Sequence, residues 1–169
     1  ELFEASYPAE HFDVVIASEI IEHVPDPEAL VIEIRRVLRP GGMLWATTPN
    51  RSGISYRLLG DQWTAVCPPE HLQLFSIAGM ESLLKAAGFK DVNVQVEGTN
   101  PYELLQKLRK RPQTKTNSAK MTGTDRVETG YALNEQLMKS PVRRALKRFV
   151  NGALRTARLG DYMKIYAVK

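Results

Sequence analysis

Acidic and imidazole side chains follow a short apolar run near the start of this sequence. The run from Val14 to Ala17 ends at Ser18, and Glu19, Glu22 and His23 come within the next five residues. Carboxylate oxygens and imidazole nitrogens can bind a divalent metal ion, and imidazole can also move a proton near neutral pH. A buried strand that ends in such groups is typical of an open α/β sheet, in which ligands sit outside the carboxyl ends of the strands.

The spacing of these groups suggests a shared site. If residues 19–23 form a helical turn, Glu19 lies three and four positions from Glu22 and His23, so all three share one face. His71, in a later polar segment, is a candidate fourth member. The four side chains are candidate ligands for a divalent metal such as Mg²⁺.

Two other interpretations of the same residues remain open. Without a metal, His23 or His71 could act as a catalytic general base, with Glu22 beside it. Alternatively, Glu22 and His23 brace the next helix, and His71 only packs within its loop.

Alternating element types must position these residues. A buried parallel strand is predicted for 13–17, because the run is short and β-branched. Asp26 and Pro27 are typical of a helix start, and Pro40-Gly41-Gly42 is expected to end that helix. A second strand is then predicted for 43–47.

The second half of the chain continues the pattern. A helix is predicted from Ser76 to Gly88, followed by a half-exposed strand over 91–97 and a closing strand over 162–168. Residues 51–75 are expected to be a long loop. Its aromatic side chains could line a pocket or form a local core; they are Tyr56, Trp63 and Phe75.

Composition favours one intracellular domain. The chain has 169 residues, of which 43% are hydrophobic, enough for one core. It contains no run of 18 apolar residues and no visible secretory signal. The single cysteine, Cys67, excludes an intramolecular disulfide and fits a reducing compartment, so a cytoplasmic location is expected.

Charge is distributed unevenly. Residues 103–158 contain 14 Lys and Arg against 4 Asp and Glu, whereas the remainder is acidic. An amphipathic helix is predicted for 141–158, and we favour a lid helix that packs on the body with a solvated basic face. The alternative is peripheral contact with an anionic membrane surface, on the inner face. No nucleic acid partner is expected, because no aromatic-rich surface accompanies the charges.

Several motifs together resemble the class I S-adenosylmethionine (SAM) methyltransferases, and most closely the quinone and small-molecule O-methyltransferases of the type 11/12/23 group. The matching segments cover most of residues 11–98 in the right order. They are Phe12–Ile16, Glu19-x-x-Glu22-His23-Val24-Pro25-Asp26-Pro27, Leu38-Arg39-Pro40-Gly41-Gly42, Thr48-Pro49-Asn50 and Ala87-Gly88-Phe89.

The resemblance implies a Rossmann-like α/β sheet of which only the second half, strands four to seven, is present. Residues 1–99 and 160–169 are expected to form this half-sheet, and 100–159 a helical basic insert. The implied spatial order of strands is 12–17, 43–48, 161–168, 91–97, with the last strand in sequence antiparallel. The first strand would then have a bare edge, to be covered by a homodimer partner or by an N-terminal half.

The resemblance also implies SAM as cofactor. It places Ala17, Ser18 and Glu19 against the methionine portion of SAM. The family's glycine-rich loop and ribose-binding acid belong to strands that this sequence does not contain. We therefore expect these residues alone to bind SAM poorly.

The implied reaction is methyl transfer to a hydroxyl of a sugar, a quinone or a related small molecule, including a lipid-linked acceptor. The Glu-x-x-Glu-His pattern with a distant His also resembles the metal site of small-RNA 2′-O-methyltransferases. The alternative function is an inert interaction module that keeps the fold but lacks the cofactor-binding half.

Overall fold

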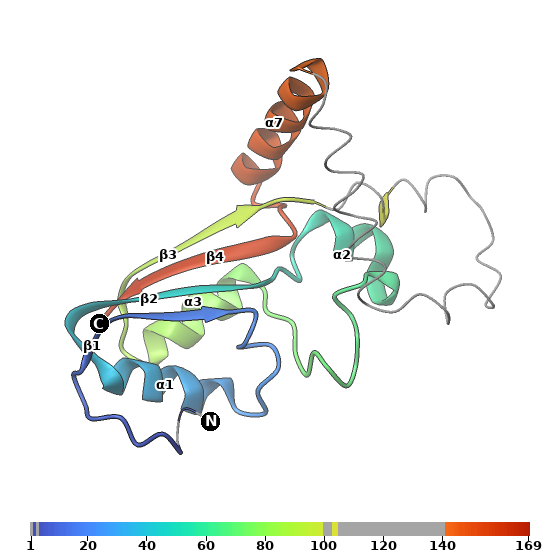
Figure 1. Cartoon of the computed structure of the whole chain (residues 1–169). Helices are drawn as coiled ribbons and strands as arrows, with labels where there is room; N and C mark the ends of the chain where they lie inside the picture. Colours follow the sequence, from blue (N-terminus) through green and yellow to red (C-terminus); the bar gives the residue numbers. More distant parts are fainter. Residues whose placement is uncertain (1, 3, 100–102, 105–140) are drawn as a thin grey trace.

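A mixed four-stranded sheet organises the described part of the chain. The computed structural model describes residues 2, 4–99, 103–104 and 141–169. The strands lie in the order β1-β2-β4-β3, with β1 parallel to β2 and β4 antiparallel to both of its neighbours (Figure 1). Their bounds are β1 Phe12–Ser18, β2 Leu38–Pro49, β3 Lys90–Glu97 and β4 Tyr162–Val168. This arrangement confirms the predicted α/β fold and strand order.

Two helices cover one face of the sheet and close the core. They are α1, Pro27–Val37, and α3, Ile77–Ala86 (Figure 1). Each begins where the sequence predicts, because the side chains of Asp26 and Ser76 accept hydrogen bonds from the first turn. The apolar stripe of each helix packs on alternate strand residues such as Leu44 and Ile165.

The junction between α1 and β2 differs from the prediction. The helix ends at Val37, and β2 begins at once with Leu38, which is fully buried and pairs with Phe12. The Pro-Gly-Gly segment therefore lies inside the strand, where it shifts the register against β1. A Cβ at Gly42 would lie 2.9 Å from the carbonyl oxygen of Arg39, so this close approach requires glycine.

The segment predicted as a long loop contains short helical elements. They are α2, Ile54–Leu59, and the 3₁₀ turn η1, Gly60–Gln62. A six-residue helix is too short to give a visible periodicity. Tertiary contacts fix it instead: the buried carboxylate of Asp161 accepts hydrogen bonds from the backbone N–H of Ser55, at 2.9 Å, and from its hydroxyl, at 2.6 Å.

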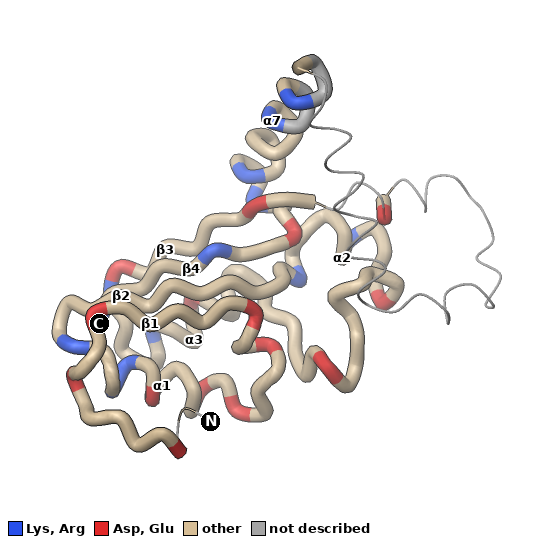
Figure 2. The backbone as a smooth tube through the Cα atoms, in the orientation of Figure 1, with Lys and Arg blue, Asp and Glu red and all other residues tan. Residues whose placement is uncertain are grey.

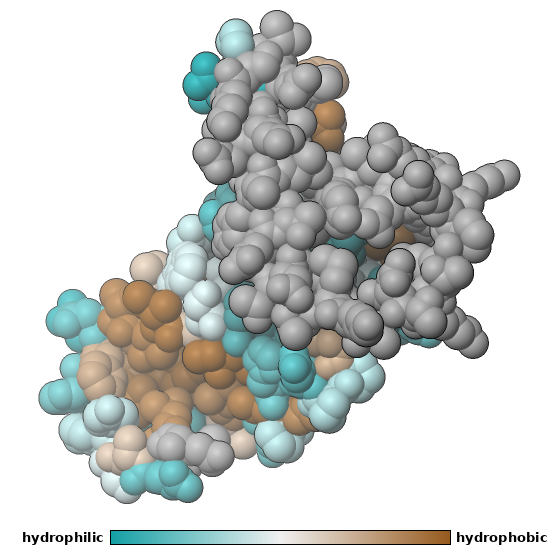
Figure 3. Space-filling view, turned by 45° about the vertical axis from the view of Figure 1, so that its right-hand side comes forward, coloured by the Kyte–Doolittle hydropathy of each residue, from teal (hydrophilic) through white to brown (hydrophobic). Residues whose placement is uncertain are grey.

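The sheet face opposite α1 and α3 exposes apolar side chains of β1. Val14 is 45% exposed and Ile16 is 66% exposed. Figure 3 shows apolar residues gathered on the body of the molecule. β1 is also the outermost strand of the sheet, so its edge is bare among the described residues, as expected, whereas the nature of its partner stays a prediction.

The basic helix α7, Pro141–Thr156, stands away from the sheet (Figure 1). Its carboxyl end is tied to the body where Arg155 donates to Gln95 and Arg158 pairs with Glu81. Among the described side chains of the apolar side, Phe149 is 75% exposed and Leu154 is partly buried, so the lid interpretation stays a prediction. Residues 100–102 and 105–140 of the predicted insert lie outside the described residues, and the division into two units stays a prediction.

Candidate active site at the carboxyl edge of the sheet

The chain turns sharply where β1 ends. Glu19 has a left-handed backbone, with φ of 51°, and its N–H donates to the carbonyl of Thr47. Residues 21–23 form a turn closed by a hydrogen bond from the N–H of His23 to the carbonyl of Ile20. The helical turn considered for 19–23 is therefore not formed, because the strand's hydrogen bonding to β2 extends through Glu19.

Glu22 is a fully buried carboxylate at this turn. Its Oε2 accepts a hydrogen bond of 2.9 Å from the hydroxyl of Thr48, the penultimate residue of β2. Its Oε1 has no hydrogen-bond partner among the described residues and lies 3.9 Å from Nε2 of His23. A buried carboxylate oxygen without a donor is costly unless something satisfies it, so this atom marks a site of chemical interest.

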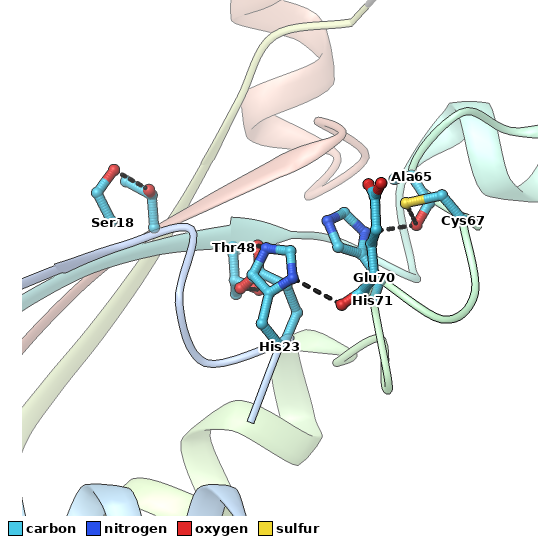
Figure 4. A network of polar contacts seen from close by, with 9 residues as sticks. Ser18, His23, Thr48, Ala65, Cys67, Glu70 and His71 are labelled. Carbon is cyan, nitrogen blue, oxygen red and sulfur yellow. Dashed lines mark hydrogen bonds and ion pairs between the residues drawn. The ribbon is translucent and has the colours of Figure 1, made fainter. Parts of the chain in front are cut away.

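The two imidazoles share one arrangement. Nδ1 of His23 lies 2.7 Å from the carbonyl oxygen of Glu70, and Nδ1 of His71 lies 2.7 Å from that of Ala65 (Figure 4). A carbonyl oxygen only accepts, so each Nδ1 carries the proton and donates it. In the neutral ring, each Nε2 is then left with a free lone pair that can accept a proton or bind a metal.

Glu22, His23 and His71 converge on one point. One potential ligand atom from each lies within 4.8 Å of the others, and the two rings stack edge to face with centroids 4.6 Å apart (Figure 4). Two imidazoles held by backbone carbonyls and an unpartnered carboxylate oxygen fit the usual donor set of a divalent metal. Glu19 lies outside this group of three.

Backbone hydrogen bonds hold the loop that contains His71 against the turn after β1. The carbonyl of Glu22 accepts from the N–H groups of Leu72 and Gln73, at 2.9 and 3.3 Å. The side-chain amide of Gln73 donates to the carbonyl of Val24. These contacts join segments that are about 50 residues apart, and no periodicity in the sequence predicts them.

Glu19 has a perturbed carboxyl group beside the group of three. Partial burial raises its pKa above the usual value, and the negative charge of Glu22 adds to this shift. The Thr47 hydroxyl and the His71 ring act in the opposite direction. Glu19 is not one of the converging ligands.

Ser18, one of the residues expected to contact SAM, lies on the other side of the same edge. Ser18 and Thr47 share a hydrogen bond of 2.9 Å between their hydroxyls, apart from the histidines (Figure 4). Successive residues of a strand point to opposite faces of the sheet. The side chain of Thr47, which bonds to Ser18, therefore points away from that of Thr48, which bonds to Glu22. Ala17 is buried in the core, which leaves only its backbone for a ligand. Contact of Ala17, Ser18 and Glu19 with SAM stays a prediction.

A shallow hollow of about 390 Å³ adjoins His71. It is lined by Arg51, Tyr56, Asp61, Ala65, Val66, Pro68, His71, Leu72, Gln73 and Leu74. Of the three aromatic residues considered for a pocket, only Tyr56 lines it. Trp63 is 2% exposed in a local core, and Phe75 packs against the main core.

Two other features are less suited to catalysis. A hollow of about 460 Å³ lies near Glu10, Arg35 and Lys169, at the amino end of β1 and β2, whereas ligands of such sheets sit at the carboxyl end. Cys67 has a raised pKa, mainly because of burial, which disfavours the reactive thiolate.

Comparison with known proteins decides the family. The family model described as "Methyltransferase domain" matches residues 1–94, more than half of the chain. This chain belongs to that methyltransferase family. The match includes β1, β2 and every member of the Glu22–His23–His71 group.

The chain is also similar to curated methyltransferases. The chain is 45% identical over 114 residues to a ubiquinone biosynthesis O-methyltransferase of Thiobacillus denitrificans, covering 64% of the chain and 49% of the relative. It is 36% identical over 100 residues to the mitochondrial human protein of that name, covering 56% of the chain and 27% of the relative. The chain thus spans half or less of these relatives' length.

Solved structures support the fold. A SAM-dependent methyltransferase from Archaeoglobus fulgidus superposes with a TM-score of 0.55 at 17% identity, over the whole chain and 65% of that structure. A SAM-dependent methyltransferase from Thermotoga maritima gives 0.54 at 17% identity, over 97% of the chain and 59% of that structure. The described half-sheet is therefore a methyltransferase fold.

Proposed function

We propose that this chain provides the acceptor side of a SAM-dependent O-methyltransferase, acting on a hydroxyl of a quinone-related molecule. The observation that carries the proposal is the convergence of Glu22, His23 and His71 at the carboxyl edge. The quinone class rests on the relatives named for ubiquinone biosynthesis. Sugars and lipid-linked hydroxyl compounds are the other acceptor classes compatible with the sequence.

His71 is proposed to receive the acceptor's proton. Its Nε2 carries a lone pair because Nδ1 donates to Ala65, and its ring lines the hollow in which an acceptor would sit. The acceptor oxygen attacks the sulfonium methyl group, so an O–CH₃ bond forms while the S–CH₃ bond breaks. The hydroxyl proton passes to Nε2, and S-adenosylhomocysteine leaves as a neutral thioether.

Glu22 and His23 support this step. The buried Glu22 carboxylate lies 3.9 Å from His23 and would stabilise positive charge on the neighbouring imidazoles. Glu22, His23 and His71 would also be the ligands of a divalent metal, which would lower the pKa of a bound hydroxyl. Alignment of acceptor and donor supplies the remaining acceleration.

An isotope experiment tests the proposed reaction. The full protein is incubated with SAM labelled in its methyl group and with a dihydroxy aromatic acceptor, and the product is identified by mass spectrometry and NMR. The expected product carries the label as a methoxy group. No transfer to any hydroxyl acceptor, or label found on nitrogen or carbon, would overturn the assignment.

A further inference from the structure

The described side chains of α7 divide into an apolar and a cationic side. At 3.6 residues per turn, Arg144, Arg148 and Arg155 fall within about 40° of one another around the helix axis. Phe149 and Ala153 fall on the opposite side. Figure 2 shows basic positions along α7 and no acidic ones, and residues 141–158 contain no Asp or Glu.

Several described side chains on the apolar side of α7 are exposed to solvent. Phe149 is 75% exposed and Val150 is 42% exposed, and Ala145 and Ala153 are exposed as well. An exposed phenylalanine is unfavourable in water. Together with the cationic stripe beside it, this side chain favours binding to a surface that is both apolar and anionic.

We propose that α7 binds the surface of an anionic lipid bilayer, lying in the interface with Phe149 and Val150 among the acyl chains and with Arg144 and Arg148 at the headgroups. A bilayer offers both negative charge and an apolar layer, which matches the two sides of the helix. No helix among the described residues is long and apolar enough to cross a membrane, so the contact is peripheral.

The position of α7 links this surface to the candidate active site. The helix leads into β4, whose first residue, Tyr162, pairs with Pro49 of β2 and Glu97 of β3. This is the carboxyl end of β2, where Thr48 holds Glu22. A bilayer bound at α7 would therefore lie at the end of the sheet from which a lipid-soluble acceptor would enter. The membrane contact itself does not depend on the proposed reaction.

Vesicle sedimentation tests the proposal with the full chain. Vesicles of phosphatidylcholine alone are compared with vesicles that contain 30% phosphatidylglycerol. The chain is expected to sediment with the anionic vesicles and to remain in solution with the neutral ones. Raising NaCl from 0.1 to 1 M is expected to release most of it, because the charges are solvent-exposed.

Matched variants assign the binding to α7. Arg144→Gln with Arg148→Gln is expected to lower the partition coefficient about 30-fold, and Phe149→Ser about tenfold. The controls are Lys85→Gln with Lys90→Gln, which removes the same charge elsewhere, and Ile32→Ser, which removes an apolar side chain that is 51% exposed on α1. Both controls are expected to bind like the unaltered chain, and circular dichroism checks that every variant is folded.

Several outcomes would overturn the proposal. They are equal binding to neutral vesicles, no binding to anionic ones, and α7 variants that bind no worse than the controls. Preferential binding to duplex DNA without vesicle binding would show that the cations serve a nucleic acid instead.

Discussion

At the residue scale, the tautomers of two histidines determine what the site can do. His23 and His71 both donate from Nδ1 to a backbone carbonyl, and each leaves Nε2 as an acceptor. The two rings come from different loops, yet they meet beside the buried Glu22. A proton acceptor and a metal ligand need the same free lone pair, so the geometry serves either chemistry.

Glu19 gives a prediction about pH. Burial and the charge of Glu22 raise its pKa in the folded chain, so the folded state binds this proton more tightly than the unfolded state does. The contribution of Glu19 to stability is therefore fully present at acidic pH, below its unfolded pKa. It is lost as the pH rises through the raised folded pKa.

Replacing Glu19 tests this linkage. Glu19→Gln removes the unfavourable charge, and it should raise the midpoint of thermal unfolding at pH 7 and change it little at pH 4. Melting curves at both pH values measure the difference, with Glu28→Gln on the exposed first turn of α1 as control. A variant that is less stable at pH 7 would show that the folded structure stabilises the negative charge of Glu19.

Asp161 gives a prediction about stability. Asp161→Ala should lower the free energy of unfolding by about 3 kcal/mol, because it leaves the N–H and hydroxyl of the buried Ser55 without their acceptor. Urea denaturation measures the effect, and Asp61→Ala at an exposed position is the control. Equal effects of the two substitutions would mean that Asp161 does not hold α2 to the sheet.

At the element scale, the regular elements and the meeting of Glu22, His23 and His71 could be predicted from sequence, but the contacts that bring His71 there could not. The cap at Asp26 and the β-branched run of β1 gave the correct element types, whereas Pro40-Gly41-Gly42, expected to end α1, lies inside β2. The helical turn considered for residues 19–23 is not formed, because strand hydrogen bonding through Glu19 excludes a helix. The approach of His71 depends on backbone contacts of Glu22 with residues 72–73, which leave no local pattern in the sequence.

The N-terminal cap of α1 allows a test of how one side chain stabilises a helix. Asp26→Ala removes the acceptor for the N–H of Ala29 and should cost about 1 kcal/mol of stability. Chemical denaturation is the measurement. Asp26→Ser should recover most of the loss, since a serine oxygen can also cap a helix. Failure of serine to recover stability would point to the charge of Asp26 rather than to capping.

At the scale of the whole molecule, the described chain forms one half of a methyltransferase sheet. Val14 and Ile16 of β1 remain exposed on the face that α1 and α3 do not cover. The relatives are about twice the length of the match or longer, so they contain segments that this comparison does not cover. That a second copy or another segment covers β1 stays a prediction.

The half-sheet leads to a prediction about the cofactor. The 169-residue chain should show no heat of binding with SAM at micromolar concentration. It holds strand ends such as Ser18 and Thr47, but its sequence has no glycine-rich loop of the family's kind for the cofactor. Titration calorimetry measures this directly. Tight binding by the chain alone would mean that other residues replace that loop.

The most direct test of the central claim is the rate of methyl transfer after a single histidine is replaced. In the full protein, His71→Ala should lower kcat at least about 100-fold, the usual contribution of a general base, and leave the Kd for SAM unchanged. His11→Ala, which removes the histidine outside the site, should leave both unchanged. Full turnover in His71→Ala would contradict the account and reduce His71 to a packing residue.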